Sequence, residues 1–590
     1  MNTQVNRVGV NSTAGCVEDG NRSPEPVHAP QAVSSPLSLI DRLLDEQQEL
    51  TAVERFSRTH QDADASMRTK QYSALLPATP PGEGQQYAFE VDLDLCTGCK
   101  ACVTACHSLN GLDEGETWRD VGLLHGGSEE LPILQHVTTA CHHCLQPACL
   151  TACPVDAYEK DPVTGIVKHL DDQCFGCQYC TLACPYDVPK YHKQKGIVRK
   201  CDLCSGRLAI GEAPACAQAC PNEAIAIKLV DVDQVIADCE TNQFLPGAPD
   251  PQLTLPTTTY KSSRVFPRNM LPADYYSVRP EHAHGPLVIM LVLTQLSVGA
   301  YCVELVSEQF LAQKLISAIR PVHSLSALLF GLLALGASVF HLGRPQFAWR
   351  SVIGLRHSWL SREILAFGVF AMLAVLYAWA NWFGGEINSS RPVWQNLPGW
   401  GVGVAGLAGL TCSVMIYVST RRQYWSGMRT TFRFFATALL LGLAATWLTL
   451  LLVSLGSEAD VAWIVVRQHG PVLCRALIVV SAAKLLFEAC LFRHLRSLQH
   501  TPLRRSAALL AGTLSSPTIA RFSLGFLGGV CMPGLLLLNH TVDSETAASQ
   551  GILAVSVAML FVACLAGELL ERYLFFASCA APRMPGGLPR

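Results

Sequence analysis

Four tight groups of cysteines are the residues of this chain best suited to chemistry. The sequence has 25 cysteines, and sixteen of them lie between Cys96 and Cys220. The groups are Cys96-x2-Cys99-x2-Cys102-x3-Cys106, Cys141-x2-Cys144-x4-Cys149-x3-Cys153, Cys174-x2-Cys177-x2-Cys180-x3-Cys184 and Cys201-x2-Cys204-x11-Cys216-x3-Cys220. Such repeated close spacing indicates metal or cluster ligation, whereas scattered pairs in a small secreted domain would indicate disulfides.

The spacing favours iron-sulfur clusters over zinc. A cubane of iron and sulfide needs four thiolates, and C-x2-C-x2-C lets one loop turn three of them inward. The cysteine three residues later, followed by proline in the last three groups, then points to a second cluster. Zinc sites use pairs of C-x2-C and do not need the third close cysteine. Sixteen ligands therefore predict four 4Fe-4S clusters.

Because the last cysteine of each group crosses over, the groups must pair. In the standard double-ferredoxin arrangement the outer two groups pair with each other, and so do the inner two. We therefore expect four ligand sets: Cys96, Cys99, Cys102 and Cys220; Cys201, Cys204, Cys216 and Cys106; Cys141, Cys144, Cys149 and Cys184; and Cys174, Cys177, Cys180 and Cys153. A row of one-electron carriers serves to move electrons over a distance.

The segments around these groups have recognisable patterns. Three of them, residues 87–96, 165–170 and 224–230, read as strands beside the cysteine groups. Residues 1–35 are rich in Pro, Ser, Asn and Gly and are expected to be disordered. Residues 35–60 carry apolar side chains at helical spacing, which predicts amphipathic helix that packs on the adjacent domain or docks to another subunit.

The second half of the chain is apolar. Eight segments, each near the 20 residues needed to cross hydrocarbon, predict membrane helices. They are roughly 286–306, 323–341, 363–383, 399–418, 434–455, 472–492, 522–539 and 549–571. Eight such runs in succession leave little room for a soluble core.

Arginine placement predicts the topology. The loops after segments two, four and six, with the C-terminal tail, hold sixteen arginines, and the other loops hold four Lys or Arg. By the positive-inside rule the arginine-rich loops, and the cysteine region beside them, face the cytoplasm of an inner membrane. Basic loops could also dock an acidic partner surface.

The polar N-terminus shows no secretory signal. The net charge of the chain is -3, and no basic tract suggests that it binds nucleic acid.

Residues 86 to about 235 resemble the four-cluster iron-sulfur subunit of dimethyl sulfoxide reductase-type molybdoenzymes, and 284–577 resemble their membrane anchor subunit. The chain looks like a fusion of the two. The resemblance implies an α+β double bacterial-ferredoxin-like domain followed by an all-α transmembrane bundle of eight helices. The expected units are 1–85, N-terminal segment; 86–235, four-cluster domain; 236–283, tether; 284–577, anchor; and 578–590, tail.

The resemblance also implies a quinone site. FHLGRP at 340–345 and SWLSREIL at 358–365 resemble anchor signatures in which the His and Glu, here His341 and Glu363, belong to a menaquinol site. Quinol oxidation releases two protons with two electrons, so a His and a carboxylate beside an apolar slot are suitable acceptors. An interfacial His and a helix-capping Glu are the alternative. Arg475 resembles the third quinone residue, although its predicted depth is towards the opposite face, where a snorkelling Arg is equally expected.

Three further ionisable residues lie in the predicted helices. Lys484 and Glu488 are four residues apart, which predicts an intrahelical pair, and Glu568 suits either a hydrogen-bonding role or a proton path. No haem is expected, because the histidines of this half lie near segment ends or in loops.

The function implied is that of a non-catalytic electron-transfer and anchor subunit, linking quinone or menaquinone to a separate molybdopterin catalytic subunit. The direction of electron flow is open: reduction of dimethyl sulfoxide or a nitrate-type substrate, or cytoplasmic sulfite oxidation that donates to quinone. A redox-linked ion-translocating module is a further alternative. A zinc-dependent regulator tethered to a transporter is a third class, and it predicts no iron.

Overall fold

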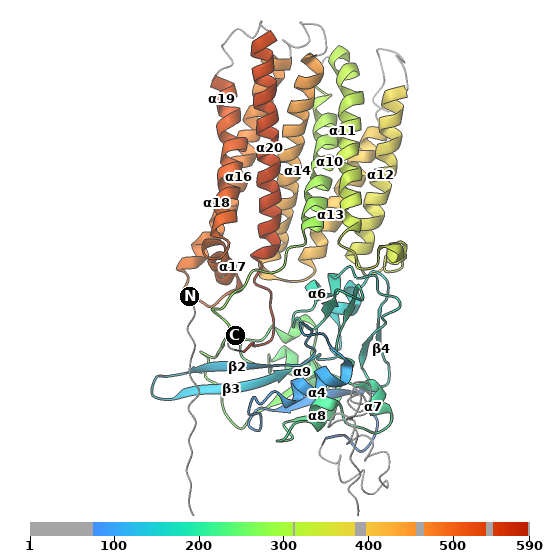
Figure 1. Ribbon diagram of the computed structural model, residues 1–590, viewed down its shortest axis with the longest axis vertical. Coiled ribbons are helices and arrows are strands. Elements are labelled where there is room, and N and C mark those ends of the chain that lie inside the picture. Colours follow the sequence, from blue (N-terminus) through green and yellow to red (C-terminus); the bar gives the residue numbers. More distant parts are fainter. Residues whose placement is uncertain (1–74, 311–312, 384–396, 456–464, 539–546, 588–590) are drawn as a thin grey trace, which may run out of the picture.

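The computed structural model describes residues 75–310, 313–383, 397–455, 465–538 and 547–587. The expected disordered residues 1–35 and the amphipathic segment 35–60 lie outside the described residues. Figure 1 shows two parts: a mixed domain that carries the cysteine groups, here called the cysteine domain, and a long helical bundle standing on it.

One sheet brings the two ends of the cysteine domain together. β1 (Gln85–Asp92) pairs antiparallel with β8 (Ile225–Asp231), with Val91 opposite Ile225, and β9 (Thr259–Lys261) lies parallel to β1 on its other edge. β8 confirms the strand predicted at 224–230, and β1 confirms the one predicted at 87–96 as far as Asp92, where a turn that leads to Cys96 begins. Because Cys96 follows β1 and Cys220 precedes β8, this pairing brings the first and fourth cysteine groups together.

The rest of the cysteine domain is built from short pieces. β2 (Asp120–Gly127) and β3 (Pro132–Thr139) form a long hairpin, which β10 (Leu271–Pro272) extends. Two small hairpins are β4 (Tyr158–Lys160) with β5 (Val167–His169), and β6 (Lys190–His192) with β7 (Ile197–Arg199). β5 confirms the strand predicted at 165–170. The helices are α4 (Ala101–Asn110), α5 (Ala148–Ala152), α6 (Tyr179–Ala183), α7 (Ser205–Ala209), α8 (Ala215–Gln218) and α9 (Val232–Glu240).

The segment 236–283, expected to be a tether, runs along the cysteine domain. It includes the end of α9, a 3-10 helix of one turn, η1 (Pro251–Leu253), and strands β9 and β10. The two strands join the sheets of β1 and β2. The chain is therefore held against the cysteine domain until it enters the bundle.

Eight helical segments occupy the eight predicted positions. They are α10 (Gly285–Ser307), α11 (Gln313–Val339), α12 (Trp359–Phe383), α13 (Leu397–Val418), α14 (Gly427–Leu455), α16 (Gly470–Ala489), a segment made of α18 (Ser515–Phe526), the π turn η7 (Leu527–Cys531) and α19 (Met532–Leu538), and α20 (Ala547–Ala577). In the part of the chain that the structure describes, seven helices are long and apolar enough to cross a membrane, and α16 is not among them. α16 packs against α14, α18 and α19.

The bundle is organised around α10 and α14. In their most apolar stretches 72% and 78% of residues are buried, against 28% in α11, so α10 and α14 form the centre. The two helices approach closely at Gly299 and Gly442, where a Cβ atom on either residue would run into the main chain of the other helix. The outer helices expose large apolar side chains, such as Leu329 and Trp379, to the surroundings.

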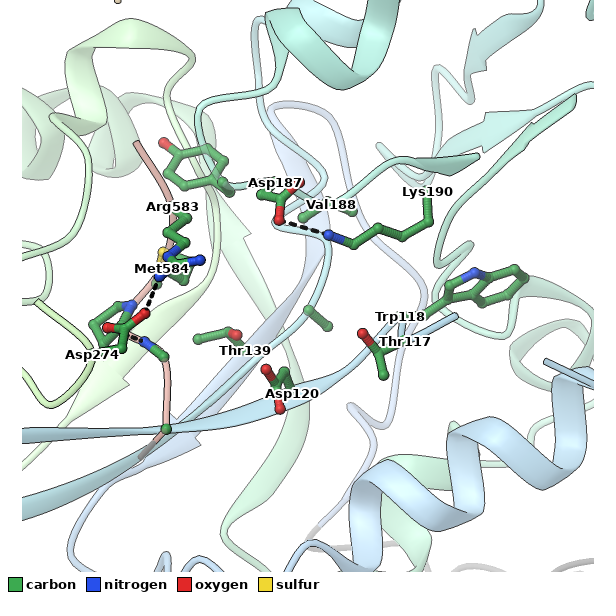
Figure 2. Close-up of a pocket in the computed structure, with 15 residues that line it drawn as sticks. Thr117, Trp118, Asp120, Thr139, Asp187, Val188, Lys190, Asp274, Arg583 and Met584 are labelled. Carbon is green, nitrogen blue, oxygen red and sulfur yellow. Dashed lines mark hydrogen bonds and ion pairs between the residues drawn. The ribbon is translucent and has the colours of Figure 1, made fainter. Parts of the chain in front are cut away.

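The connections between helices are short elements on the side of the cysteine domain. They are η2 (Pro345–Val352), η4 (Gln423–Trp425), η6 (Cys490–Arg496) and α17 (Pro502–Ala511), while the π turn η5 (Val465–His469) precedes α16 at the other end. After α20 the chain returns to the cysteine domain. The main-chain N–H of Leu123 donates to the carbonyl of Gly586 at 3.1 Å, and Arg583 pairs with Asp274. Figure 2 shows this tail lying beside β2, with Arg583 directed at Asp274.

Candidate metal centres and membrane site

The structure places the thiols of each expected set near one another, and thiols of neighbouring sets also approach, as Cys102 does Cys216 and Cys201 does Cys141. The thiol of Cys96 lies within electrostatic range of Cys99, Cys102 and Cys220, and a small cavity is lined by these four residues. A second small cavity is lined by Cys141, Cys144, Cys149 and Cys184. Each set is named below after the first cysteine of the group that supplies three of its four thiols, which gives the Cys96, Cys141, Cys174 and Cys201 sets.

The other two sets have the same organisation. The thiol of Cys106 is close to those of Cys204 and Cys216, and Cys201 adjoins all three. In the last set, Cys177 and Cys180 are both close to Cys153 and Cys174. The last cysteine of each group thus lies near thiols of the partner group, and its assignment to the cluster of that group stays a prediction.

Local backbone geometry explains how each loop turns its cysteines inward. In the first and third groups a glycine stands before the second cysteine, with φ of 75° at Gly98 and 74° at Gly176, and a left-handed residue follows it at Lys100 and Gln178. This left-handed region favours glycine because a Cβ atom is crowded there. The short helix that begins next carries the third cysteine, so the loop and helix together place three thiols around one point.

Hydrogen bonds from the chain are directed at sulfur. The main-chain N–H of Ala157 donates to Sγ of Cys153, and that of Ala224 donates to Sγ of Cys220, both at 3.3 Å. Each donor lies four residues after the crossing cysteine. Hydrogen bonds to sulfur are among the features that set cluster potentials.

The burial of the thiols also suits cluster ligands. Eleven of the sixteen cysteines are buried, and Cys99 is the exposed one. Burial raises the pKa of the Cys153 and Cys184 thiols to about 11 each. A free thiol there keeps its proton, so the charged form needs a cationic partner such as bound iron. The cavities, the donor set and the N–H···S contacts together fit 4Fe-4S clusters.

The four sets run from the bundle to the far surface of the cysteine domain. The Cys174 set adjoins the bundle: Tyr179 beside Cys180 donates its hydroxyl to the carbonyl of Ile416 at 3.1 Å and lies 2.8 Å from the hydroxyl of Ser419. Figure 1 shows α6 next to the bundle and α4, α7 and α8 at the opposite end. α4 begins within the first group, so the Cys96 set lies away from the bundle.

His341 and Glu363 both lie at the end of the bundle that faces the Cys174 set. His341 follows the end of α11 by two residues, and in the part of the chain that the structure describes its Nδ1 is buried without a hydrogen-bond partner. Glu363, in the first turns of α12, is 4% exposed and accepts a hydrogen bond from the hydroxyl of Ser413 on α13. Tyr179 of the cysteine domain lies within electrostatic range of Glu363.

Arg475 lies elsewhere. It is in the second turn of α16, the end remote from the cysteine domain, and its side chain is exposed on the bundle surface. Glu363 is at the opposite end of the bundle. The structure therefore does not bring Arg475 to His341 and Glu363, and it gives Arg475 the surface position of a snorkelling side chain.

Lys484 has a closer partner than the one expected. Its Nζ is 4.0 Å from Glu488 on the same helix, but it also forms an ion pair with Glu568 of α20 and this contact is the shorter one. Arg521, on α18, bonds Glu488 at 2.9 Å and Glu568 at 3.0 Å. These four buried residues form an ion network across three helices. Arg521 is one of the sixteen arginines assigned above to loops and tail, and its position directly before the apolar segment 522–539 is the feature of the sequence that points to a helix instead.

Two family models match the chain. Residues 133–230 match a 4Fe-4S dicluster domain. Residues 281–577, half of the chain, match the DMSO reductase anchor subunit, DmsC. The chain belongs to the DMSO reductase anchor subunit family. Since the iron-sulfur domain precedes the anchor on the same polypeptide, the protein is a fusion of the two kinds of subunit.

Individual relatives match the iron-sulfur half of this fusion. An anaerobic dimethyl sulfoxide reductase subunit of Haemophilus influenzae is 32% identical over 189 residues, which cover 30% of this chain and 91% of that protein. The Escherichia coli protein of the same name is 36% identical over 154 residues, covering 25% of this chain and 75% of that protein. The thiosulfate reductase electron transfer subunit PhsB of Salmonella typhi is 36% identical over 153 residues, covering 25% and 79%.

The fusion is therefore an electron-transfer iron-sulfur and membrane anchor subunit of DMSO reductase-family complexes. Its anchor half is a multi-pass membrane domain. The relatives that share its cysteine domain are named as subunits of reductases for different substrates. The iron-sulfur half alone does not select between them.

Proposed function

We propose that this chain passes electrons between a membrane quinone and a separate molybdopterin catalytic subunit through four 4Fe-4S clusters. The observation that carries this proposal is that the Cys174 set lies against the end of the bundle that contains His341 and Glu363. The Cys96 set, with the exposed Cys99, lies at the far end. A row of four sites thus has one end at the membrane and one end at an open surface.

The sixteen cysteines in their four sets would hold the clusters, each of which, when bound, stores one electron at a time. The main-chain N–H groups of Ala157 and Ala224 stabilise charge on the crossing thiolates. Lys200, which is 3% exposed, donates to the carbonyl of Cys201 at 2.8 Å and lies 3.6 Å from Sγ of Cys141. It links the Cys141 and Cys201 sets.

At the membrane end, His341 and Glu363 would accept the protons of a quinol. Oxidation of one quinol releases two electrons and two protons, so each residue takes one proton while the electrons leave through the Cys174 set. The buried Nδ1 of His341 and the carboxylate of Glu363, which accepts a hydrogen bond from Ser413, support this role. Quinone reduction is the same exchange in reverse. Arg475 has no part in this proposal, because it lies at the other end of the bundle.

An even number of crossings follows from where the bundle begins and ends. α10 starts beside the cysteine domain, and the N–H of Glu281, just before it, donates to the carbonyl of Ala577 at the end of α20 at 3.1 Å. Both ends of the bundle therefore lie on one side, which seven crossings would not allow. We propose α16, packed among α14, α18 and α19, as the eighth.

The arginine distribution supports placing the cysteine domain on the cytoplasmic side. Some of these arginines also make contacts within the chain. Arg344, Arg350 and Arg422 donate to carbonyl oxygens of Asp171, Asp172 and Leu182 on the cysteine domain. Protease treatment of inverted and right-side-out vesicles tests the side: cleavage of the cysteine domain in inverted vesicles alone is expected, and cleavage in right-side-out vesicles contradicts it.

The test of the central proposal uses the purified membrane complex. About sixteen iron and sixteen acid-labile sulfide per chain are expected from four cubanes. His341→Ala and Glu363→Gln should abolish cluster reduction by a quinol analogue while leaving the dithionite-reduced EPR spectrum intact. Normal quinol kinetics in both variants would contradict the assignment of His341 and Glu363 to a quinone site. The identity of the copurifying catalytic subunit separates dimethyl sulfoxide-type reduction from sulfite oxidation.

A redox-linked ion-translocating module is the second candidate, and the ion network of Lys484, Glu488, Arg521 and Glu568 favours it. Buried ionisable groups inside a membrane bundle are costly and are often functional. In proteoliposomes this candidate predicts that quinol turnover moves more protons than the chemistry releases, and that Glu568→Gln removes the excess. Proton release that matches the chemistry alone excludes it.

A further inference from the structure

A buried guanidinium lies between the two outermost cysteine sets. Arg119, one residue before β2, is 2% exposed. Its Nη1 donates to Oγ1 of Thr138 at 3.1 Å, and its Cζ lies 4.4 Å from the centre of the Phe89 ring. Among the described residues, its Nε and Nη2 are buried without a hydrogen-bond partner. A buried cation with unused donors is costly unless an anion faces it.

Thiols of two sets lie close to Arg119, together with the side chains of His142 and Tyr260. Burial by itself would lower the pKa of Arg119, but Cys216, Cys102, Cys201 and Cys106, in that order, outweigh burial and raise it. Cys102 belongs to the Cys96 set, and the other three belong to the Cys201 set. The nearby carboxylate of Glu116 is already used by Arg199 at 3.1 Å and by the indole of Trp118 at 2.9 Å.

One hydroxyl connects the guanidinium to a sulfur atom. Oγ1 of Thr138 accepts from Arg119 and lies 3.5 Å from Sγ of Cys102. The hydroxyl can therefore donate its own proton to that sulfur while it accepts from Arg119. This link reaches the Cys96 set, while the rest of the guanidinium faces the Cys201 set.

Lys200 is a useful contrast. It is as deeply buried, but its ammonium donates to the carbonyl oxygens of Cys201 and Val167. Two neutral acceptors therefore satisfy most of the Lys200 ammonium, and one thiol, Sγ of Cys141, also lies 3.6 Å from it. Arg119 has one neutral acceptor for a forked group with five N–H donors.

We propose that Arg119 is the residue that raises the reduction potentials of the two outer clusters, those of the Cys96 and Cys201 sets. An electron is therefore more stable on these two clusters than it would be without Arg119. This proposal rests on the proposed function, since it requires four clusters. As one electron passes, one centre is oxidised and its neighbour is reduced. Arg119 keeps its proton and its charge throughout, because a guanidinium is not deprotonated in proteins.

Potentiometric EPR titration of the full complex tests this. In Arg119→Gln, reduction of two of the four clusters should become at least tenfold less favourable at a given ambient potential, which is 59 mV for a one-electron couple. The two inner couples should not move. Arg119→Lys should restore much of the shift, because it returns the charge. Arg264→Gln, at a side chain that is 60% exposed, is the matched control and should change nothing.

Thr138→Val separates charge from local structure. It removes the hydroxyl link and keeps the cation, so a smaller loss is expected in the Cys96 couple alone. Four unchanged couples in an Arg119→Gln protein that keeps its iron overturn the proposal. If Arg119→Gln loses iron, Thr138→Val and Arg119→Lys decide, and wild-type potentials in Thr138→Val overturn it. Fewer than four clusters in the wild-type complex instead contradict the proposed function.

Discussion

The main-chain N–H of Arg344 donates to the carbonyl oxygen of Phe175 at 2.9 Å. This hydrogen bond joins the loop that follows α11 to the loop of the third cysteine group. Gly343, next to Arg344, approaches the main chain of Gly196 so closely that a Cβ atom would have no room. His341 lies two residues before Gly343, so this contact fixes the candidate quinone residue relative to the Cys174 set.

Gly343→Ala should therefore slow cluster reduction by quinol. The added methyl group meets backbone, which cannot rotate away, so the loop must move off the cysteine domain. Stopped-flow reduction by a quinol analogue measures the effect, and dithionite-reduced EPR spectra should stay unchanged. Gly336→Ala, where a Cβ atom meets nothing, is the control. Equal rates in both variants would show that this loop contact is not needed.

Arg475→Gln should leave quinol kinetics unchanged. The side chain is exposed in α16 at the end of the bundle remote from His341 and Glu363. The measurement is the same stopped-flow reduction, compared with Glu363→Gln. A loss of activity equal to that of Glu363→Gln would mean that quinone also uses the remote end.

Substitution of single cysteines tests the crossover. Cys106→Ser should alter the same EPR signal as Cys204→Ser, because both residues belong to the Cys201 set. Cys99→Ser should alter a different signal, although Cys99 is closer to Cys106 in sequence. Shared effects of Cys99→Ser and Cys106→Ser would instead indicate that each group serves its own cluster.

Removing one member of an ion pair in this network should destabilise the protein more than removing both members of the pair. Lys484→Met leaves Arg521 as the remaining cation beside Glu568, so the cost should stay below the about 3–5 kcal/mol of an uncompensated buried charge, and Lys484→Met with Glu568→Gln should recover part of it. Thermal unfolding in detergent, read by circular dichroism, measures the difference. Arg475→Met, an exposed cation on the same helix, is the control. A double variant that is no more stable than Lys484→Met contradicts the pairing.

The tail after α20 should hold the cysteine domain to the bundle. Arg583→Ala removes the pair with Asp274 and should weaken the tail contact by about 1 kcal/mol, since the pair is partly exposed. Hydrogen exchange at the Leu123 amide, which donates to Gly586, reports the change. Asp274→Asn should have a similar effect and the double variant no more than either. Unchanged protection at Leu123 would mean that the tail docks without this pair.

The cysteine sets were predictable because ligand spacing is a local property of the chain. One loop can gather three thiols that lie within seven residues around a single point, whatever the rest of the fold does, as with Cys96, Cys99 and Cys102. Only the pairing of β1 with β8 delivers Cys220 to them, and this pairing joins residues more than a hundred apart. The sheet thus supplies the physical reason why the first and fourth groups lie together, and the crossover of ligands between them stays a prediction.

The sequence by itself determined the cluster-type ligand groups, the positions of the apolar helices, and His341 and Glu363 at helix ends beside the cysteine domain. Tertiary structure decided what depends on packing between distant segments. It set Arg475 on an exposed face, paired Lys484 with Glu568, and buried Arg119 among thiols of two sets. Spacing constrains what one loop or helix can reach, but the partner of a buried charge is chosen by which helices and strands pack around it.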